Sequence, residues 1–255
     1  MKKNTKILYF ISFVSISIFI LISVRYNFVE KYQDYNEDNI NNTNIYVLYI
    51  PKREKYIKDI MKKMKLNPEY VQGPDKNKLN LEKMIENNEI TQNFGIDKNK
   101  GRIACHLGHL KILEKFLKTD KKYALIFEDD IKIDNYNDIN NKIINLINNI
   151  PPNADIVYFG YCWEKCDKTT KYNDYFNYSH LPLCRHCYLV SRNGAQTIIN
   201  NSNNINNAGD AIYYSLIKSN KLISYNVNMN YLIIKQNRSV IGSELNNNHV
   251  QKICI

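Results

Sequence analysis

Three consecutive acids, Glu128, Asp129 and Asp130, directly follow an apolar run at residues 123–127. Carboxylates repel one another, and burying them is costly unless positive charge lies among them. The acids therefore either lie in a solvated turn, which is the commoner arrangement for a charged run, or hold a cation. An all-oxygen ligand set suits Mg²⁺ or Mn²⁺, which commonly take one or two carboxylates together with substrate phosphates.

A metal held by such acids would serve a transferase that uses a nucleotide sugar. The leaving group of that reaction is a nucleoside diphosphate, and a metal neutralises the charge that develops on the departing phosphate oxygen. We expect Asp130 to be the first metal ligand and Glu128 the second. Asp129 is either a further ligand or a positioning group at the same cofactor site.

The segments that must position these acids alternate between strand and helix. Apolar, β-rich runs occupy 44–50, 123–127, 154–161 and 186–191, and helical periodicity occupies 52–66, 79–88, 102–119, 138–150 and 211–221. This alternation predicts an α/β fold with a largely parallel sheet. Ligands of such sheets gather at the carboxyl ends of the strands, which is where the acids stand.

The N-terminal segment predicts a membrane anchor. Residues 7–24 contain no charged residue, and lysines precede them within the tail at 1–6. The length and the lysine excess indicate an uncleaved anchor with a cytoplasmic N-terminus, whereas a cleavable signal peptide usually has a shorter core and a small-residue cleavage site. A polar stem at 25–43 would then join the anchor to a domain at 44–255. We therefore expect a single-pass type II membrane protein with its body on the lumenal side of the endoplasmic reticulum or Golgi, or of an equivalent viral or host endomembrane.

Composition limits the classes of partner. The chain has 255 residues, a formal charge of +10 and 44% hydrophobic residues, which suits a globular body. The charge is scattered, without a dense basic block, a basic stripe interleaved with aromatics or zinc-finger spacing, so we expect no nucleic-acid partner. The basic balance suits a solvated surface or anionic partners, such as nucleotide phosphates or a membrane surface.

Six cysteines leave two interpretations open. Cys162 and Cys166, with Cys184 and Cys187, could form a zinc knuckle. In an oxidising compartment the same clusters would more often be disulfides, and the predicted anchor favours that compartment. The pairing cannot be read from the sequence.

Several segments, in order and with matching spacing, carry a resemblance to a known family. They are IYVLYIPKREKY, GRIACHLGHL (101–110), YALIFEDDI (123–131), CYLVSRNGA (187–195) and the later Asp210. Across about residues 44–245 the chain resembles glycosyltransferase family 25, which includes bacterial lipooligosaccharide galactosyltransferases and collagen hydroxylysine galactosyltransferases.

The resemblance implies a GT-A fold, which is a Rossmann-like sheet that uses a nucleotide sugar and a divalent metal. It implies transfer of galactose or glucose from a UDP-sugar, with Mn²⁺ or Mg²⁺, to a hydroxyl of a glycan or a hydroxylysine-containing protein. Members of the family generally invert the sugar's configuration. Inversion requires in-line attack and usually a carboxylate base.

The resemblance also suggests roles for single residues. Asp210 would be the base or an acceptor-positioning group, although an aspartate before a helix is equally suited to be its N-cap. His109 matches the family histidine and would line the donor site near the positive end of its helix. Arg53 would meet the diphosphate. We expect His106 to be structural and Cys105 to pack in the core.

Residues further along the chain are weaker candidates. Gln236 and Ser243 lie in a segment similar to the family's ending. Tyr161 and Trp163 could stack on a sugar or a base, or pack in the core.

Three positions depart from the family pattern. The usual glutamate is Arg102, the second glycine is Ala104, and the serine before the histidine is Gly108. These changes leave open a degenerate member that binds glycans or an active partner without catalysis. The clustered cysteines leave open a zinc-stabilised membrane interaction protein.

Overall fold

The computed structural model describes residues 39–232 and 234–237. The chain divides into two units, residues 1–41 and 42–255, and the fold described below belongs to the second. The predicted tail and anchor, and most of the predicted stem, lie outside the described residues. Within the residues that are described, every helix is too short or too polar to span a membrane.

The helices and strands follow most of the predicted pattern. The strands are β1 Thr43–Tyr49, β2 Glu69–Gln72, β3 Tyr123–Glu128, β4 Ile131–Lys132, β5 Ile156–Gly160, β6 Thr170–Lys171, β7 Phe176–Tyr178, β8 Cys187–Ser191, β9 Ser224–Val227 and β10 Lys235–Gln236. The helices are η1 Pro51–Arg53, α2 Glu54–Lys63, η2 Lys76–Lys78, α3 Leu81–Glu86, η3 Asp97–Asn99, α4 Lys100–Leu117, α5 Ile139–Asn148, α6 Arg192–Asn200 and α7 Gly209–Lys218.

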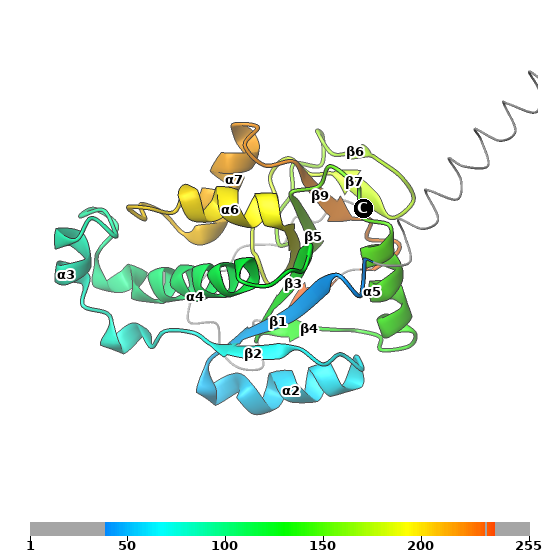
Figure 1. Cartoon of the computed structure of the whole chain (residues 1–255), viewed down its shortest axis with the longest axis horizontal. Coiled ribbons are helices and arrows are strands. Elements are labelled where there is room, and N and C mark those ends of the chain that lie inside the picture. The colour runs from blue at the N-terminus through cyan, green and yellow to red at the C-terminus, as the bar shows by residue number, and fades with distance from the viewer. Residues whose placement is uncertain (1–38, 233, 238–255) are drawn as a thin grey trace, which may run out of the picture. The chain divides into compact units, whose positions relative to one another are not determined.

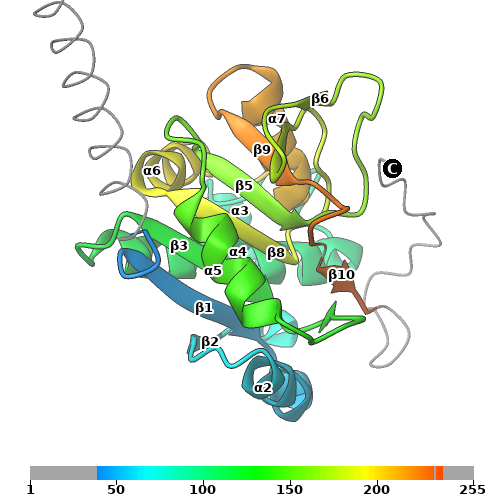
Figure 2. The ribbon, with the colours of Figure 1, turned by 90° about the vertical axis from the view of Figure 1, so that its right-hand side faces the viewer.

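Eight of these strands form one sheet, in the order β2-β1-β3-β8-β5-β9-β7-β6 (Figures 1 and 2). Among them, β7 and β8 run against the other six. The expectation of an α/β fold is therefore confirmed. Most strands of the sheet run in one direction, as expected for a largely parallel sheet. The central pairings are not parallel, however, because β8 is antiparallel to both of its neighbours, β3 and β5. A second sheet pairs β10 with β4.

Helices cover both faces of the sheet. On one face, α4, α6 and α7 bury apolar side chains against β1, β3, β5 and β8, and the buried rings of Tyr46, Phe116, Tyr158, Tyr188 and Tyr213 belong to this core. Helix α5 lies on the other face, in front of the sheet in Figure 2. A smaller apolar cluster, which includes Leu81, Met84 and Ile103, joins α3 to the start of α4.

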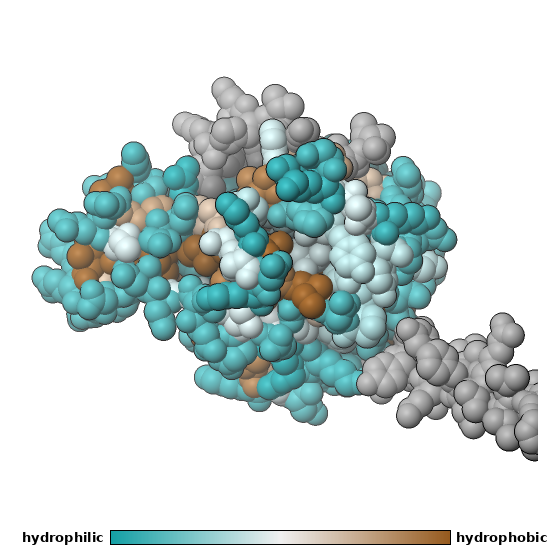
Figure 3. All heavy atoms as spheres, turned by 90° about the horizontal axis from the view of Figure 1, so that it is seen from above, coloured by the Kyte–Doolittle hydropathy of each residue, from teal (hydrophilic) through white to brown (hydrophobic). Residues whose placement is uncertain are grey.

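Local sequence explains where several elements begin and end. Ser191 caps α6 by accepting a hydrogen bond from the backbone N–H of Gly194 at 3.1 Å, so β8 passes directly into the helix. Pro51 opens the η1 turn that ends β1 and leads into α2. The face shown in Figure 3 is mostly hydrophilic with small hydrophobic patches, which agrees with the scattered lysines of the sequence.

Candidate active site

A cavity of about 670 Å³ opens at the carboxyl ends of β1, β2 and β3. Its wall also includes η1, η2 and the first turns of α4. Strands β1 and β3 are parallel, and their register places Leu48 opposite Glu128. The three acids that follow β3 therefore face the turn that follows β1. All three acids line the cavity, as expected for residues at this edge of an α/β sheet.

Asp129 is held by the turn after β1. Its Oδ2 accepts a hydrogen bond from the backbone N–H of Ile50 at 2.7 Å, and its Oδ1 accepts one from Arg53 at 2.9 Å. Burial raises the pKa of Asp129, although these two partners act to lower it. Because both carboxylate oxygens already bind the chain, the geometry favours positioning over metal ligation for Asp129. Arg53 is itself buried and lines the cavity.

Asp130 has a different environment. Its Oδ2 accepts a hydrogen bond from Gln236 at 3.0 Å and lies 3.8 Å from Arg53. Its Oδ1 is buried without a hydrogen-bond partner among the described residues. Burial, followed by the charges of Glu128 and Asp129, raises the pKa of Asp130 to about 7. A divalent cation fits here, because it would neutralise the crowded charge and give the buried oxygen a partner.

Glu128 is positioned by His109 on α4. The Nε2 atom of His109 lies 2.8 Å from Glu128 Oε1, and its Nδ1 atom lies 3.0 Å from the hydroxyl of Tyr188. Burial, and then the charge of Arg185, lower the pKa of His109 to about 4, so the ring is neutral at pH 7. A neutral ring fits this pair of contacts by donating from Nε2 to the carboxylate and accepting from the tyrosine hydroxyl.

The charge state of Glu128 follows from the same contacts. Burial acts to raise its pKa, but the hydrogen bond and charge of His109, together with Arg185, outweigh burial and lower the pKa to about 2. Oε2 of Glu128 makes no hydrogen bond to the described residues, so it can ligate a metal. His109 does not line the cavity itself. It therefore acts on the cavity through Glu128 instead of forming the wall that we expected.

Arg185 supplies positive charge behind the acids, and no periodic pattern in the sequence predicts it. Its Nη1 lies 3.2 Å from Nδ1 of His106, its Nη2 lies 3.7 Å from the sulfur of Cys105, and its guanidinium stands 4.7 Å over the ring of Tyr213. It makes no ion pair within the described part of the chain. Gly209 makes room for it, because a Cβ there would lie 2.3 Å from Nη2.

The neighbours of Arg185 test two expectations. His106 is fully buried, and burial followed by the charge of Arg185 lowers its pKa to about 2, which agrees with the structural role predicted for it. Cys105 lines the cavity instead of packing wholly in the core, so that expectation was wrong. Its sulfur lies 3.6 Å from Glu128 Oε1.

Asp210 lies in the first turn of α7, outside the residues that line the cavity. Its Oδ1 accepts a hydrogen bond from Ala211 N at 2.9 Å and its Oδ2 accepts one from Cys184 N at 3.3 Å. The N-cap of α7 is Ala208, so the alternative of an N-cap aspartate is wrong. The charge of Asp210 acts to raise the pKa of His109, against burial and the charge of Arg185.

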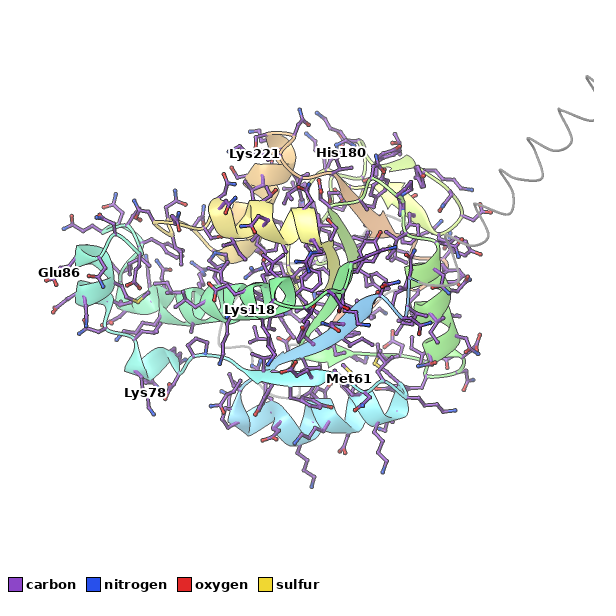
Figure 4. All side chains as sticks on the ribbon, in the orientation of Figure 1. Met61, Lys78, Glu86, Lys118, His180 and Lys221 are labelled. Carbon is purple, nitrogen blue, oxygen red and sulfur yellow. A yellow bond between two sulfur atoms is a disulfide. The ribbon has the colours of Figure 1, made fainter. Side chains whose placement is uncertain are left out.

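Another part of the cavity wall suits an anion. Helix α4 begins after Asn99 without a side-chain cap, and Gly101 and Ala104 of its first turns line the cavity. Free N–H groups at a helix N-terminus attract phosphate. Lys76 and Lys78 of η2 line the same wall, and Figure 4 shows Lys78 beside the N-terminal half of α4. Neither lysine was among the candidates predicted from the sequence, because two lysines in a short loop carry no distinctive pattern.

The remaining candidates are distributed as follows. Gln236 lines the cavity and binds Asp130, whereas Ser243 lies outside the described residues. Tyr161 is buried in the core, while Trp163 is 37% exposed at the carboxyl end of β5. Of the departures from the family pattern, Arg102 donates a hydrogen bond to Asn99 at 3.2 Å, and Ala104 lines the cavity.

A known protein family matches most of the described domain. The family described as "Glycosyltransferase family 25 (LPS biosynthesis protein)" matches residues 42–213, which include β1, the acids, Arg185 and Asp210. No curated protein matches the chain.

Proposed function

Because the chain belongs to glycosyltransferase family 25 and is a glycosyltransferase, we propose that it moves galactose or glucose from a UDP-sugar to an acceptor hydroxyl. The acceptor would be a glycan or a hydroxylysine-containing protein, and the sugar's configuration would be inverted. The domain would be a GT-A fold, carried on a type II membrane anchor at residues 7–24 that faces it toward an endomembrane lumen. The resemblance of the motifs supports the reaction and the fold, and the uncharged run at residues 7–24, with lysines before it, supports the anchor.

The observation that carries the proposal is the buried oxygen of Asp130 that has no partner in the described chain. We assign Asp130, with Oε2 of Glu128, to the binding of Mn²⁺ or Mg²⁺. Such an ion would neutralise charge on the diphosphate as it leaves. The all-oxygen set fits these ions better than it fits softer metals.

The other residues of the wall have roles that follow from their contacts. Arg53 fixes Asp129, and this pair holds the turn after β1 against the acids. His109 orients Glu128 and keeps it charged. The N-terminus of α4, with Lys76 and Lys78, would bind the diphosphate. The wall thus brings positive groups and the candidate metal ligands to one cavity.

Asp210 remains our candidate for the base that takes the proton of the acceptor hydroxyl. Its position within the matched residues 42–213, where the family pattern has an aspartate, supports this role. Two backbone N–H groups hold its carboxylate. Inversion would proceed by attack of the acceptor oxygen on the anomeric carbon as the bond to the diphosphate breaks.

Turnover of the donor tests this proposal. The purified full-length chain in detergent is given UDP-galactose or UDP-glucose with Mn²⁺ and a panel of acceptors, and released UDP is measured. We expect release that EDTA abolishes and that Asp130→Ala removes. Asp174→Asn is a matched control, because Asp174 is 86% exposed and pairs only with Lys171 among the described residues. EDTA-resistant release, or full activity in Asp130→Ala, would overturn the metal assignment.

A further inference from the structure

A second group of ligand atoms lies at the same edge of the sheet as the acids. Cys162 follows β5, Cys184 precedes β8, and the two form a disulfide across 22 residues. The two sulfurs and a ring nitrogen of His186 all lie within 4.8 Å of one another. Cys166 follows Cys162 by four positions; it lies outside this group of three and is itself disulfide-bonded. Disulfide pairing agrees with the sequence-based preference, but an imidazole is not needed for a disulfide.

The ring of His186 is oriented as a metal ligand would be. It is fully buried, and its Nε2 lies 2.7 Å from the backbone oxygen of Ile234. A carbonyl oxygen can only accept, so Nε2 carries the proton and Nδ1 carries the lone pair. Histidines that bind metals commonly donate their second ring N–H to a backbone carbonyl in this manner.

Gly160 shows that this orientation depends on close packing. A Cβ at Gly160 would lie 2.2 Å from the oxygen of Ile234 and 2.3 Å from Nε2 of His186. Any larger residue would separate the ring from the carbonyl. The sequence of β5 therefore leaves space for a histidine held in one tautomer beside sulfur ligands.

We propose that the reduced chain binds one Zn²⁺ through the sulfurs of Cys162, Cys166 and Cys184 and Nδ1 of His186. Two equivalents of a thiol reductant convert the Cys162–Cys184 disulfide into two thiols and become a disulfide themselves, and two further equivalents release the thiol of Cys166 from its own disulfide in the same way. The three cysteine thiols then lose their protons to solvent as they bind the ion. Three thiolates and one imidazole form a common tetrahedral zinc set, and the x3 spacing of Cys162 and Cys166 fits it.

The disulfide and the zinc ion are then two alternative links for the same pair of loops. These loops contact Gln236 of the cavity wall and Asp210, which lies outside that wall. The sulfur of Cys162 lies 3.5 Å from Oε1 of Gln236, which binds Asp130, and Cys184 N donates to Asp210. Either link would hold these contacts, one in oxidising and the other in reducing surroundings.

Metal binding by the reduced full-length chain tests the proposal. The chain in detergent is reduced under inert gas in the presence of EDTA, desalted, and titrated with Zn²⁺ and separately with Co²⁺. We expect one zinc per reduced chain and intense cobalt–thiolate absorption, and neither in the oxidised chain. The titrations are repeated in Asp130→Asn, so that binding at the acids is not counted. Absence of thiolate absorption in the reduced chain would overturn the proposal.

Variants separate this ligand set from other cysteines. Cys166→Ser and His186→Asn should each weaken zinc binding about tenfold or more, because each removes a ligand from the set. Cys187→Ala is the matched control, since Cys187 is a buried free thiol in β8 outside the set. Unchanged affinity in both ligand variants would overturn the proposal.

Alkylation of the unaltered chain gives a readout that does not depend on the variants folding. We expect zinc to protect Cys162, Cys166 and Cys184 from iodoacetamide in the reduced chain, as mapped by mass spectrometry. Equal labelling of these cysteines with zinc and with EDTA would contradict the assignment.

Discussion

Asp130 and Glu164 are both buried carboxylates that follow a strand of the same sheet, β3 for one and β5 for the other. Both oxygens of Glu164 are satisfied by the chain. Its Oε1 accepts from the backbone N–H groups of Lys165, His180 and Leu181, and its Oε2 accepts from the side chains of Ser179 and Asn226. Asp130 lies among like charges with one oxygen that the described chain does not satisfy.

The difference separates a structural acid from the proposed metal ligand. A buried carboxylate that is fully hydrogen-bonded holds loops together and needs no further partner. One that is left incomplete in the wall of a cavity carries a free-energy cost that a ligand can remove. Burial alone would have ranked Glu164, which is fully buried, above Asp130, which is 7% exposed.

The largest expected effect is a loss of activity that distinguishes Asp130 from Glu164. Asp130→Asn should lower kcat/KM for sugar transfer about 100-fold or more, because a metal contributes several kcal/mol to charge stabilisation in such reactions. Its free energy of unfolding without metal should stay the same or rise, since a charge is removed from a crowded buried site. Steady-state kinetics and urea unfolding measure the two quantities. A large loss of stability would show that Asp130 is structural, as Glu164 is.

Glu164→Gln should give the opposite result. The amide NH₂ of glutamine would face groups that themselves donate hydrogen bonds, so we expect the free energy of unfolding to fall by about 2–3 kcal/mol. Activity per folded molecule should remain near that of the wild type. Urea unfolding followed by circular dichroism measures the change. A stable variant with no transferase activity would reverse the comparison.

The two histidines of α4 extend the comparison within one helix. His109 contacts Glu128 in the cavity wall, whereas His106 contacts Arg185 behind it. His109→Gln should lower kcat/KM about tenfold, the lower end of the losses seen when a partner of a metal ligand is removed. A matched His106→Gln variant should change kcat/KM less. Equal losses in both would place the two residues in the same structural role.

His106 should instead be detected by the pH dependence of stability. Its pKa in the folded chain is lowered to about 2, so the ring stays neutral while the unfolded chain takes up a proton below about pH 6.5. The contribution of neutral His106 to the free energy of unfolding is therefore fully present above pH 6.5 and is lost as the pH falls. Between pH 7.5 and pH 5 the wild type should lose about 2 kcal/mol more than His106→Gln. Urea unfolding at both pH values checks this, and parallel losses would contradict it.

The smallest expected effect concerns Gly108, where the family pattern has serine. A Cβ at Gly108 would lie 2.7 Å from a terminal methyl group of Leu48, which lines the cavity beside Glu128. Gly108→Ser should cost about 1 kcal/mol, because overpacking is partly offset by the better helix propensity of serine. Thermal unfolding measures this change. A stabilised variant would show that contact with Leu48 is not the reason why position 108 is a glycine.

Much of the fold could be predicted because its apolar periodicity is strong. The apolar runs at β1, β3 and β5 were correctly predicted to be strands, and the apolar face of α4 was correctly predicted to belong to a helix. The direction of β8 could not be read, since a strand buried on both faces is apolar in either orientation. The short β6–β7 hairpin was missed because its polar and aromatic residues show no clear alternation.

The site was predictable to the extent that its residues are adjacent in sequence. Glu128, Asp129 and Asp130 were found as one run, but their separate environments depend on Ile50, Arg53, His109 and Gln236, which are brought in by tertiary contacts. Arg185 was missed because it lies in a loop. The Cys162–Cys184 pairing was likewise fixed only by the approach of β5 and β8.

Calorimetric titration of UDP into the full-length chain, with and without Mn²⁺, tests the central claim most directly. We predict that UDP binds tightly only with Mn²⁺, that Asp130→Asn abolishes this dependence, and that folded Glu164→Gln retains it. Mn²⁺-dependent UDP binding of equal affinity in Asp130→Asn would contradict the assignment of Asp130 as the metal ligand.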